Sequence, residues 1–596
     1  YYTDLDNPVA LATGNEHSYI NNRFTGNAFV EANILPGLKF KSLFGYEKFN
    51  NQYRSFVDPF RTTEGRKYKG MATLQQQDNQ YWMSENTLNY NRTFSDKHHF
   101  TGLLGYITTK TQTTTSNIAT QNFANPAIHT VNGGSMITAM PTAVDAAVST
   151  VSGIAKIGYD YNDKYLFTAN LRADASSVFG PNNRWGYFPS FSAGWRLSNE
   201  DFFSSLKNTV NDLKIRASWG KVGNSQIPAF SYLGLVDVTG SYNIGDQVVP
   251  GYTPATLDNP NLKWETTNQT DIGVDASFFN SRLIFGADYY AKRTVGLLLS
   301  SRVPYSSGYR TALKNLGDLQ NRGFEFELSS RNFVHDFKWN TTVTFGLNRN
   351  KVLNIDGGTY YDGNIDGRGN STIAKEGVAL GSFWGYIAKG VNPETGDMIY
   401  QMADPEAGLQ TSDMAIIGNA TPKFSYGMTN DFSYKNFNFS FFLQGVQGND
   451  ILNATRIYTE GMWEPRNQSV AVLNRWTVDN NNSIMPRPDL NNTDDNYNSQ
   501  ISSRFVEKGS YLRVKSMTLA YTLPKQVLER WKLNKVRFYV TGENLLTFTK
   551  YSGLDPEVSM YGGTNQQTVS SNMAPGIDFG TSPQARTFIV GLNLTF

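Results

Sequence analysis

Apolar residues recur at every second position in many segments, and this spacing constrains the fold more than any other feature of the chain. Phe437, Phe439 and Phe441, for example, alternate with Asn438 and Ser440. A period of two places the two sets of side chains on opposite faces of a β-strand. Roughly 17 or 18 segments have this pattern, so the sequence predicts an all-β protein with one large sheet.

The connections between these segments alternate in length. Short links rich in Asn, Asp and Ser stand at 95–97, 162–164, 280–282, 334–336 and 435–436. Long polar stretches stand at about 111–149, 224–263, 300–314, 355–421, 453–505 and 552–584. Short turns at one rim and long loops at the other are typical of transmembrane barrels, whose long loops are extracellular. We therefore expect a large antiparallel transmembrane β-barrel, closed because lipid leaves no partner for a free strand edge.

A soluble β-sandwich is the main structural alternative, and the composition argues against it. Aromatic residues make up 14% of the chain and charged residues 17%, whereas soluble proteins average about 25% charged residues. The polar faces carry full charges beside Gly and small hydroxyls, which indicates a wet interior. No apolar run reaches the ~18 residues of a membrane helix.

Several functional classes are disfavoured by what the chain contains. The net charge of +2 makes no case for nucleic acid, and the absence of Cys excludes disulfides. We find none of the common hydrolase, zinc-protease or nucleotide-binding motifs, so an enzyme is not expected. A loop with Asp479, Asp489, Asp494 and Asp495 is acidic enough for Ca²⁺ but lacks the spacing of a known calcium loop. We read it as a solvated loop and predict no cofactor.

The last residues and one inner segment need separate comment. Phe588, Val590, Leu592, Leu594 and Phe596 share one face of a terminal strand. A final strand that ends in Phe resembles the signal read by the outer-membrane barrel-assembly machinery; an ordinary edge strand is the alternative. Along 511–522 the apolar phase switches near Ser516, which predicts a β-bulge.

A set of motifs spread over nearly the whole chain resembles the SusC/RagA family of TonB-dependent transporters from Bacteroidetes. The motifs are RADASSVFG at 172–180, NRWGYFPS at 183–190, AGWR at 193–196, NPNLKWE at 259–265, NRGFE at 321–325, LNRWT at 473–477, YLRVK at 511–515, GENLLTFTKY at 542–551, DPE at 555–557 and GLN at 591–593.

This resemblance implies an outer-membrane location in a Gram-negative bacterium. Family members carry an N-terminal TonB box and plug, then a 22-stranded barrel. We find neither the box nor the plug, so residues 1–596 are interpreted as the barrel domain without its plug and first few strands. It also implies TonB-driven import of oligosaccharides or peptides, with a SusD-like lipoprotein on the extracellular loops and TonB acting through the N-terminal part.

Two groups of residues are candidates for a role in transport. Trp384, Trp463, Tyr360 and Tyr361 lie in long loops, and aromatic rings stack on sugars. The alternative is that these rings pack the loops or join the interfacial aromatic girdle. Arg216, Glu325, Glu327 and Arg537 are expected to line the lumen. They either face the transport path or pair with each other and with the plug.

Two other functions compete with active import. A passive porin would share the barrel, but porins are usually shorter and lack the motifs above. A surface adhesin or structural β-protein would share the strands but not a requirement for detergent.

Overall fold

The computed structural model describes residues 6–138, 141–355, 358–365, 368–463, 467–489, 497–531, 533–558 and 573–596. They fall into two compact units. Unit 1 comprises Tyr1–Ser192, Gly220–Thr266 and Leu298–Asn315, and unit 2 comprises Ala193–Trp219, Thr267–Leu297 and Leu316–Phe596.

The described residues contain an 18-stranded antiparallel sheet, as the alternation predicted. Its strands are β1 (Asn15–Leu35), β2 (Leu38–Val57), β3 (Met71–Phe94), β4 (His98–Phe123), β5 (Gly134–Ile137), β6 (Thr142–Tyr161), β7 (Tyr165–Ser176), β8 (Trp185–Arg196), β9 (Val210–Asn224), β12 (Glu265–Phe278), β13 (Leu283–Val295), β16 (Asp318–Val334), β17 (Phe337–Asn354), β24 (Phe424–Tyr434), β25 (Phe437–Gln447), β28 (Tyr511–Thr522), β29 (Lys535–Thr549) and β31 (Thr587–Thr595).

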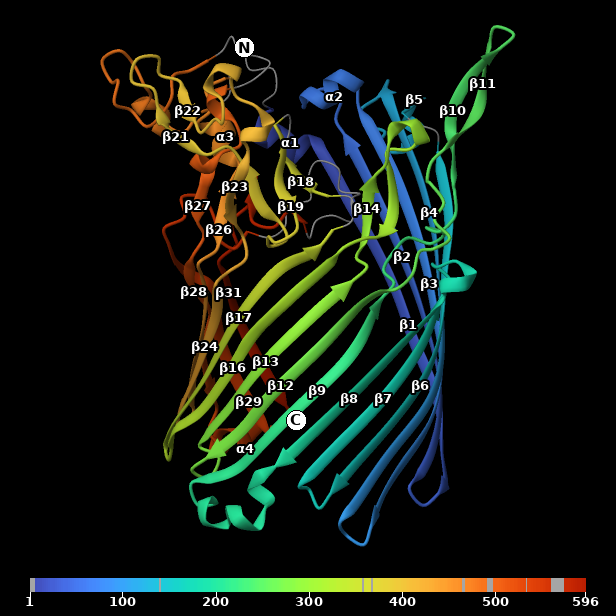
Figure 1. The fold of residues 1–596 in the computed structure, drawn as a ribbon, viewed down its shortest axis with the longest axis vertical. Coiled ribbons are helices and arrows are strands. Elements are labelled where there is room, and N and C mark those ends of the chain that lie inside the picture. Colours follow the sequence, from blue (N-terminus) through green and yellow to red (C-terminus); the bar gives the residue numbers. More distant parts are fainter. Residues whose placement is uncertain are drawn as a thin grey trace. The chain divides into compact units, whose positions relative to one another are not determined.

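Neighbouring strands are joined as a meander. In unit 1 the pairs run β1–β2–β3–β4–β6–β7 (Figure 1). In unit 2 they run β13–β16–β17–β24–β25–β28–β29–β31. Each strand thus satisfies its backbone groups with its neighbours in sequence, which is the pairing expected of an up-and-down barrel wall.

The predicted short turns are confirmed. Ser95 and Asp96 have φ of 49° and 51°, and Asn162 and Asp163 have φ of 51° and 55°. Two consecutive residues with positive φ make the tight hairpin turn that matches the twist of the flanking strands. Asn and Asp tolerate this conformation better than most residues, which explains the composition of these links.

Both faces of the sheet are exposed in long stretches. On β16, Phe324 is 46% exposed although its neighbour Glu325 is exposed as well. A strand in a sandwich would bury one of the two. Apolar and polar faces that are both open fit a sheet with lipid on one side and water on the other, so the described strands do not form two sheets around a dry interior.

The predicted bulge near Ser516 is also present. The register of β28 against β29 shifts between Val514 and Ser516, and its register against β25 shifts at the same place. The extra residue, Lys515, exchanges the face on which apolar side chains appear. The phase switch in the sequence is therefore a change of register and not an interruption of the strand.

One predicted loop is too long. The stretch from 111 to 149 was expected to be a loop, but β4 continues to Phe123 and β6 begins at Thr142. Thr and Ser fill both faces there, so no alternation marks the strand. Thr is β-branched and favours extended backbone whether or not either face is apolar.

The long loops contain smaller sheets. Their strands are β10 (Val236–Ile244), β11 (Gln247–Pro254), β14 (Leu298–Arg302), β15 (Thr311–Asn315), β18 (Tyr360–Ile365), β19 (Gly369–Ala374), β20 (Ser382–Gly385), β21 (Ala388–Val391), β22 (Met398–Tyr400), β23 (Ala415–Asn419), β26 (Asp450–Asn453), β27 (Val506–Lys508) and β30 (Ile577–Asp578).

Helices are few and short: α1 (Pro8–Gly14), α2 (Thr63–Tyr68), α3 (Thr455–Thr459) and α4 (Lys525–Trp531). Within the described ranges, none has both the length and the apolar character needed to cross a bilayer.

The best-buried apolar side chains lie in the loops. In unit 2, Phe383, Leu452, Ile457 and Phe505 are each 0% exposed and belong to one cluster. In unit 1, the ring of Trp264 packs on Phe179 and Phe188, both at 5.3 Å between centroids, and its indole N–H donates to the carbonyl of Arg184 at 2.8 Å. Motifs that are far apart in the sequence thus meet and hold the loops in fixed shapes.

Candidate functional site

A cavity of about 540 Å³ lies among the loops of unit 2. It is surrounded by α3, by the end of β26 and by the segments that follow β29 and β30. Eight of its fourteen lining residues carry a hydroxyl or a carboxyl group. The lining consists of Asn453, Thr455, Arg456, Thr459, Glu460, Ser469, Ala471, Glu507, Ser552, Gly553, Leu554, Asp578, Gly580 and Thr581. We call it the loop cavity.

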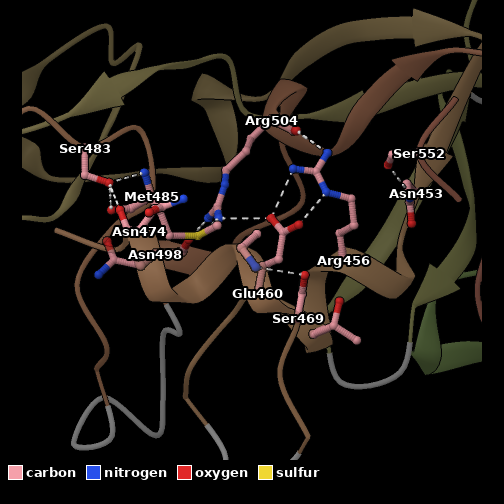
Figure 2. Close-up of polar contacts among 12 residues, drawn as sticks. Asn453, Arg456, Glu460, Ser469, Asn474, Ser483, Met485, Asn498, Arg504 and Ser552 are labelled. Atoms are coloured by element: carbon pink, nitrogen blue, oxygen red, sulfur yellow. Dashed lines mark hydrogen bonds and ion pairs between the residues drawn. The ribbon is translucent and has the colours of Figure 1, made fainter. Parts of the chain in front are cut away.

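The wall of the loop cavity is fixed by an ion-pair network. The Arg456 guanidinium donates to both carboxylate oxygens of Glu460, at 2.8 and 3.0 Å, and to Glu507 at 2.9 Å. Arg504 donates to Glu460 from the other side at 3.3 Å (Figure 2). The fork of Arg456 matches the planar carboxylate, so both side chains have one orientation.

Burial and hydrogen bonds change the protonation of these groups. Burial lowers the pKa of Arg504 below that of a free guanidinium, although the charge of Glu460 opposes the change. Burial alone would raise the pKa of Glu507, but hydrogen bonds from Ser552 and the charge of Arg456 outweigh it and lower the pKa. Glu507 is therefore ionised at neutral pH, and the network is a set of true ion pairs.

A second anchor closes the cavity beneath Asp578. The Tyr551 hydroxyl donates to the Asp578 carboxylate at 2.5 Å, and Asp578 is 4% exposed. Burial, and then the hydrogen bond to Asp578, raise the pKa of Tyr551 far above its ordinary value. The phenol remains protonated and serves as a permanent donor. The arrangement can hold a polar ligand.

The segment that forms one side of the cavity is tied to the large sheet by Arg513. This side chain is 1% exposed and donates to Asp555 at 2.5 Å, to Glu557 at 2.6 Å and to Thr547 at 2.9 Å. Lys515 reaches Glu557 at 3.0 Å. Two of the motifs noted in the sequence, 511–515 and 555–557, are thus partners in one buried site.

The aromatic candidates lie near this region but outside the cavity lining. Trp384 is on β20, and its ring is 6.0 Å from that of Tyr361, which is 43% exposed. Tyr360 precedes Tyr361 on β18. Arg368 stacks over the ring of Trp463 at 4.0 Å. These contacts show that Trp384 and Trp463 pack within the loops, and their role in substrate contact stays a prediction.

Three of the four lumen candidates line one hollow on the polar face of the sheet. The hollow has a volume of about 640 Å³, and Arg216, Glu325 and Glu327 are among its lining residues. Gly286 and Gly346 contribute no side chain to its floor. Arg537 is placed elsewhere, on β29, with its guanidinium 5.5 Å from the ring centre of Tyr539.

Arg216 is held by carboxylates from two neighbouring strands. Its guanidinium lies 2.6 Å from Asp288, 3.1 Å from Asp275 and 3.3 Å from Asp271. The side chain remains 33% exposed. Arg216 thus pairs with aspartates of the sheet and stays partly exposed to water, and its place on the transport path stays a prediction.

The C-terminal strand β31 pairs with β29 and presents the predicted face. Phe588, Val590, Leu592 and Leu594 are 72%, 81%, 50% and 46% exposed, and the terminal Phe596 is 82% exposed. Recognition of this strand by the assembly machinery stays a prediction.

The acidic loop lies partly outside the described residues, which include Asp479 and Asp489 but not Asp494 or Asp495. Where the chain is described, no three acidic, His or Cys side chains are grouped as metal ligands would be.

Sequence reasoning missed the residues that form the loop cavity. Arg456 and Glu460 are four apart, which is the spacing of an ion pair on a helix, and this was the one local signal. Arg504 and Glu507 reach the same site from a segment about 50 residues away, and no periodicity marks them.

The chain matches known proteins over its whole length. Residues 1–545 match the family described as TonB dependent receptor-like, beta-barrel. TonB-dependent receptor P3 of Formosa agariphila is 34% identical over 614 residues, which cover 100% of this chain and 60% of that protein. TonB-dependent receptor SusC of Bacteroides thetaiotaomicron is 31% identical over 482 residues, covering 76% of this chain and 44% of SusC.

A solved structure shows the same fold. The RagAB peptide transporter superposes with a TM-score of 0.85 at 23% identity, covering 98% of this chain and 63% of that one. The chain spans about 60% of the length of the curated Formosa relatives. The antiparallel sheet with its short turns and long loops thus has the fold of a known outer-membrane transporter. The chain therefore belongs to the TonB-dependent receptor family and is a SusC/RagA-like outer-membrane β-barrel protein of a Gram-negative bacterium.

Proposed function

We propose that this chain forms the barrel of a TonB-driven importer of oligosaccharides or peptides. The observation that supports it most directly is the loop cavity, a hollow of about 540 Å³ with charged and hydroxyl-bearing residues in its lining, in a protein of this family. A cavity of this size fits a small polar ligand. Similarity to SusC of Bacteroides thetaiotaomicron and the fold of the RagAB peptide transporter favour a glycan or a peptide as that ligand.

The proposed partners are those that the resemblance to the SusC/RagA family implies. A SusD-like lipoprotein would sit on the extracellular loops, and the TonB complex would supply energy through a part of the transporter outside this chain. The ordered loop sheets offer the lipoprotein a preformed surface, and the exposed ring of Tyr361 beside Trp384 belongs to it. Purification from the native membrane should then bring down a surface lipoprotein, and its loss from a Trp384→Ala, Tyr361→Ala variant would locate the contact.

Uptake measurements test the transport proposal. Cells with the gene deleted should lose uptake of a fluorescent neutral oligosaccharide or of a fluorescent oligopeptide, and the gene should restore it. Removal of TonB should abolish the restored uptake. Uptake that survives without TonB would instead favour the passive porin.

A matched pair of variants tests the cavity. Ser469→Trp places a large ring in the loop cavity and should raise the half-saturating substrate concentration. Val470→Trp adds the same ring at the next position, which is 78% exposed and outside the lining, and should leave uptake unchanged. Equal uptake by the two variants would show that the loop cavity does not bind the substrate.

A further inference from the structure

The first strands of unit 1 are much longer than a membrane requires. β1, β2, β3, β4 and β6 have 21, 20, 24, 26 and 20 residues. A tilted strand crosses the hydrocarbon with about 9–11 residues. Roughly half of each strand therefore stands outside the bilayer, on the side opposite the hairpin turns at 95–97 and 162–164 (Figure 1).

The register identifies the outward face along the full length of these strands. The β2–β3, β3–β4 and β4–β6 ladders have no register shift, so cross-strand partners stay on one face throughout. Near the turns this face carries Leu88, Leu104 and Ile157, the last two 60% and 65% exposed. Large exposed apolar side chains at this depth are lipid contacts.

A row with two aromatic side chains crosses this face. Tyr46 pairs with Trp82, and Trp82 pairs with Lys110. Aromatic side chains with a polar end mark the membrane–water interface of outer-membrane barrels. Beyond this row the outward face of β2, β3 and β4 carries mainly amides, hydroxyls and a few charges, whereas on the turn side Ser84 and Asn86 are interspersed with apolar side chains.

A groove of about 340 Å³ occupies this polar part of the face. Two cross-strand rows form it, Asn22–Asn50–Asp78–Thr114 and Ile20–Gln52–Gln76–Ser116. We call it the outer groove. Farther from the membrane it is bounded by Phe56, Ala72 and Phe123, which pack together under Val131.

The chemistry of the outer groove suits neutral sugars. Asp78 is neutralised by Lys48 at 3.2 Å and accepts from Asn50 at 2.9 Å. Gln52 and Gln76 make no side-chain hydrogen bond to any residue that the structure describes, so their amides are available. Each free amide offers two donors and one acceptor oxygen, which match the mixed donor and acceptor character of sugar hydroxyls.

The height of the outer groove selects the source of the sugar. Its rows lie four and six residues beyond the row of Tyr46 and Trp82. At about 3.3 Å per residue and a tilt of about 40°, this is about 10–15 Å above the membrane interface. An outward face at that height meets the saccharide layer of the outer leaflet. We propose that the outer groove binds the core saccharide of lipopolysaccharide.

The test compares two triple variants of the full chain in mild detergent. Gln52→Ala, Gln76→Ala, Thr114→Val removes three groups from the outer groove. Asn79→Ala, Thr113→Val, Thr115→Val removes similar groups at the same height from the opposite face of β3 and β4. Native mass spectrometry then measures binding of lipopolysaccharide that carries its core saccharide, and of lipid A that lacks it.

The expected result is about tenfold weaker binding of core-bearing lipopolysaccharide to the first variant only. Lipid A should bind the unmodified chain and both triple variants equally weakly. Equal loss in both variants, or lipid A binding as well as core-bearing lipopolysaccharide, would overturn the proposal. A change of oligomeric state in the first variant without loss of lipopolysaccharide would show that a second copy of the chain fills the groove. The single substitution Gln76→Glu keeps the side-chain shape. The same binding comparison can therefore be made with minimal effect on folding.

Discussion

Two arginines of unit 2 are each held by carboxylates, one in a buried site and one in a site open to water. The side chain of Arg513 is 2% exposed between Asp555 and Glu557, whereas the side chain of Arg216 is 33% exposed among three aspartates. Arg216 has more acidic neighbours, but water reaches them. Because solvent screens charges, burial sets the effect of removing the cation more than the number of partners does.

The two sites also connect different things. Arg513 joins β28 to a segment that no strand pairing holds, since Asp555 and Glu557 follow the end of β29. That segment supplies Ser552 and Leu554 to the loop cavity. Arg216 joins β9 to β12 and β13, which the sheet already contains. Loss of Arg513 should therefore loosen the cavity, and loss of Arg216 should leave the sheet in place.

The largest effect is expected for Arg513→Leu. The change leaves the Asp555 carboxylate, whose side chain is 7% exposed, buried without its cation. Breaking a buried pair in this way costs about 3–5 kcal/mol of unfolding free energy. Urea unfolding in lipid vesicles measures it. Lys515→Leu, on the same strand but 31% exposed, should lose under about 1 kcal/mol. Equal losses of unfolding free energy in Arg513→Leu and Lys515→Leu would show that burial does not set the effect of removing the cation.

An intermediate effect is expected for Arg504→Met, which removes a partner of the cavity residue Glu460. Arg504 and Glu460 are 10% and 7% exposed, so the pair is as dry as the Arg513 site. Glu460 keeps its two bonds from Arg456, however, and is not left without a cation. The loss should be about 1.5–3 kcal/mol, the range of one charged hydrogen bond. A loss as large as that of Arg513→Leu would mean that Arg456 does not compensate.

Acid should weaken the loop network through Glu507. Its pKa in the folded protein is below the reference value of 4.5. The stability it contributes is present above about pH 4.5 and is lost as the pH falls through the lower folded value. Glu507→Gln should flatten this part of the profile. The rate of protease cleavage of the loops, measured against pH, reports this loss of stability. A profile that Glu507→Gln leaves unchanged would show that Glu507 does not stabilise the network.

The features predictable from sequence were those with local signals. Period-two alternation located the strands, and Asn, Asp and Ser located turns such as Ser95–Asp96. The upper half of β4 escaped because Thr fills both faces there and alternation needs two different faces. The network of Arg456, Glu460 and Arg504 escaped because residues from separate loops meet only after folding. Arg216, Glu325 and Glu327, but not Arg537, line one hollow; all three lie on strands, where parity alone assigns the face.

The smallest effect is expected for Arg216→Gln. The three aspartates left behind repel one another, but they are 20–42% exposed and water screens them. The loss should be about 1 kcal/mol or less and should shrink as salt is added, because the Debye length falls from about 10 Å at 0.1 M to about 3 Å at 1 M. The loss for Arg513→Leu should not respond to salt, since ions do not enter its site. Urea unfolding of both variants at the two salt concentrations separates the cases. If the Arg513→Leu loss also shrinks in salt, the Arg513 site is wet and burial does not explain the difference.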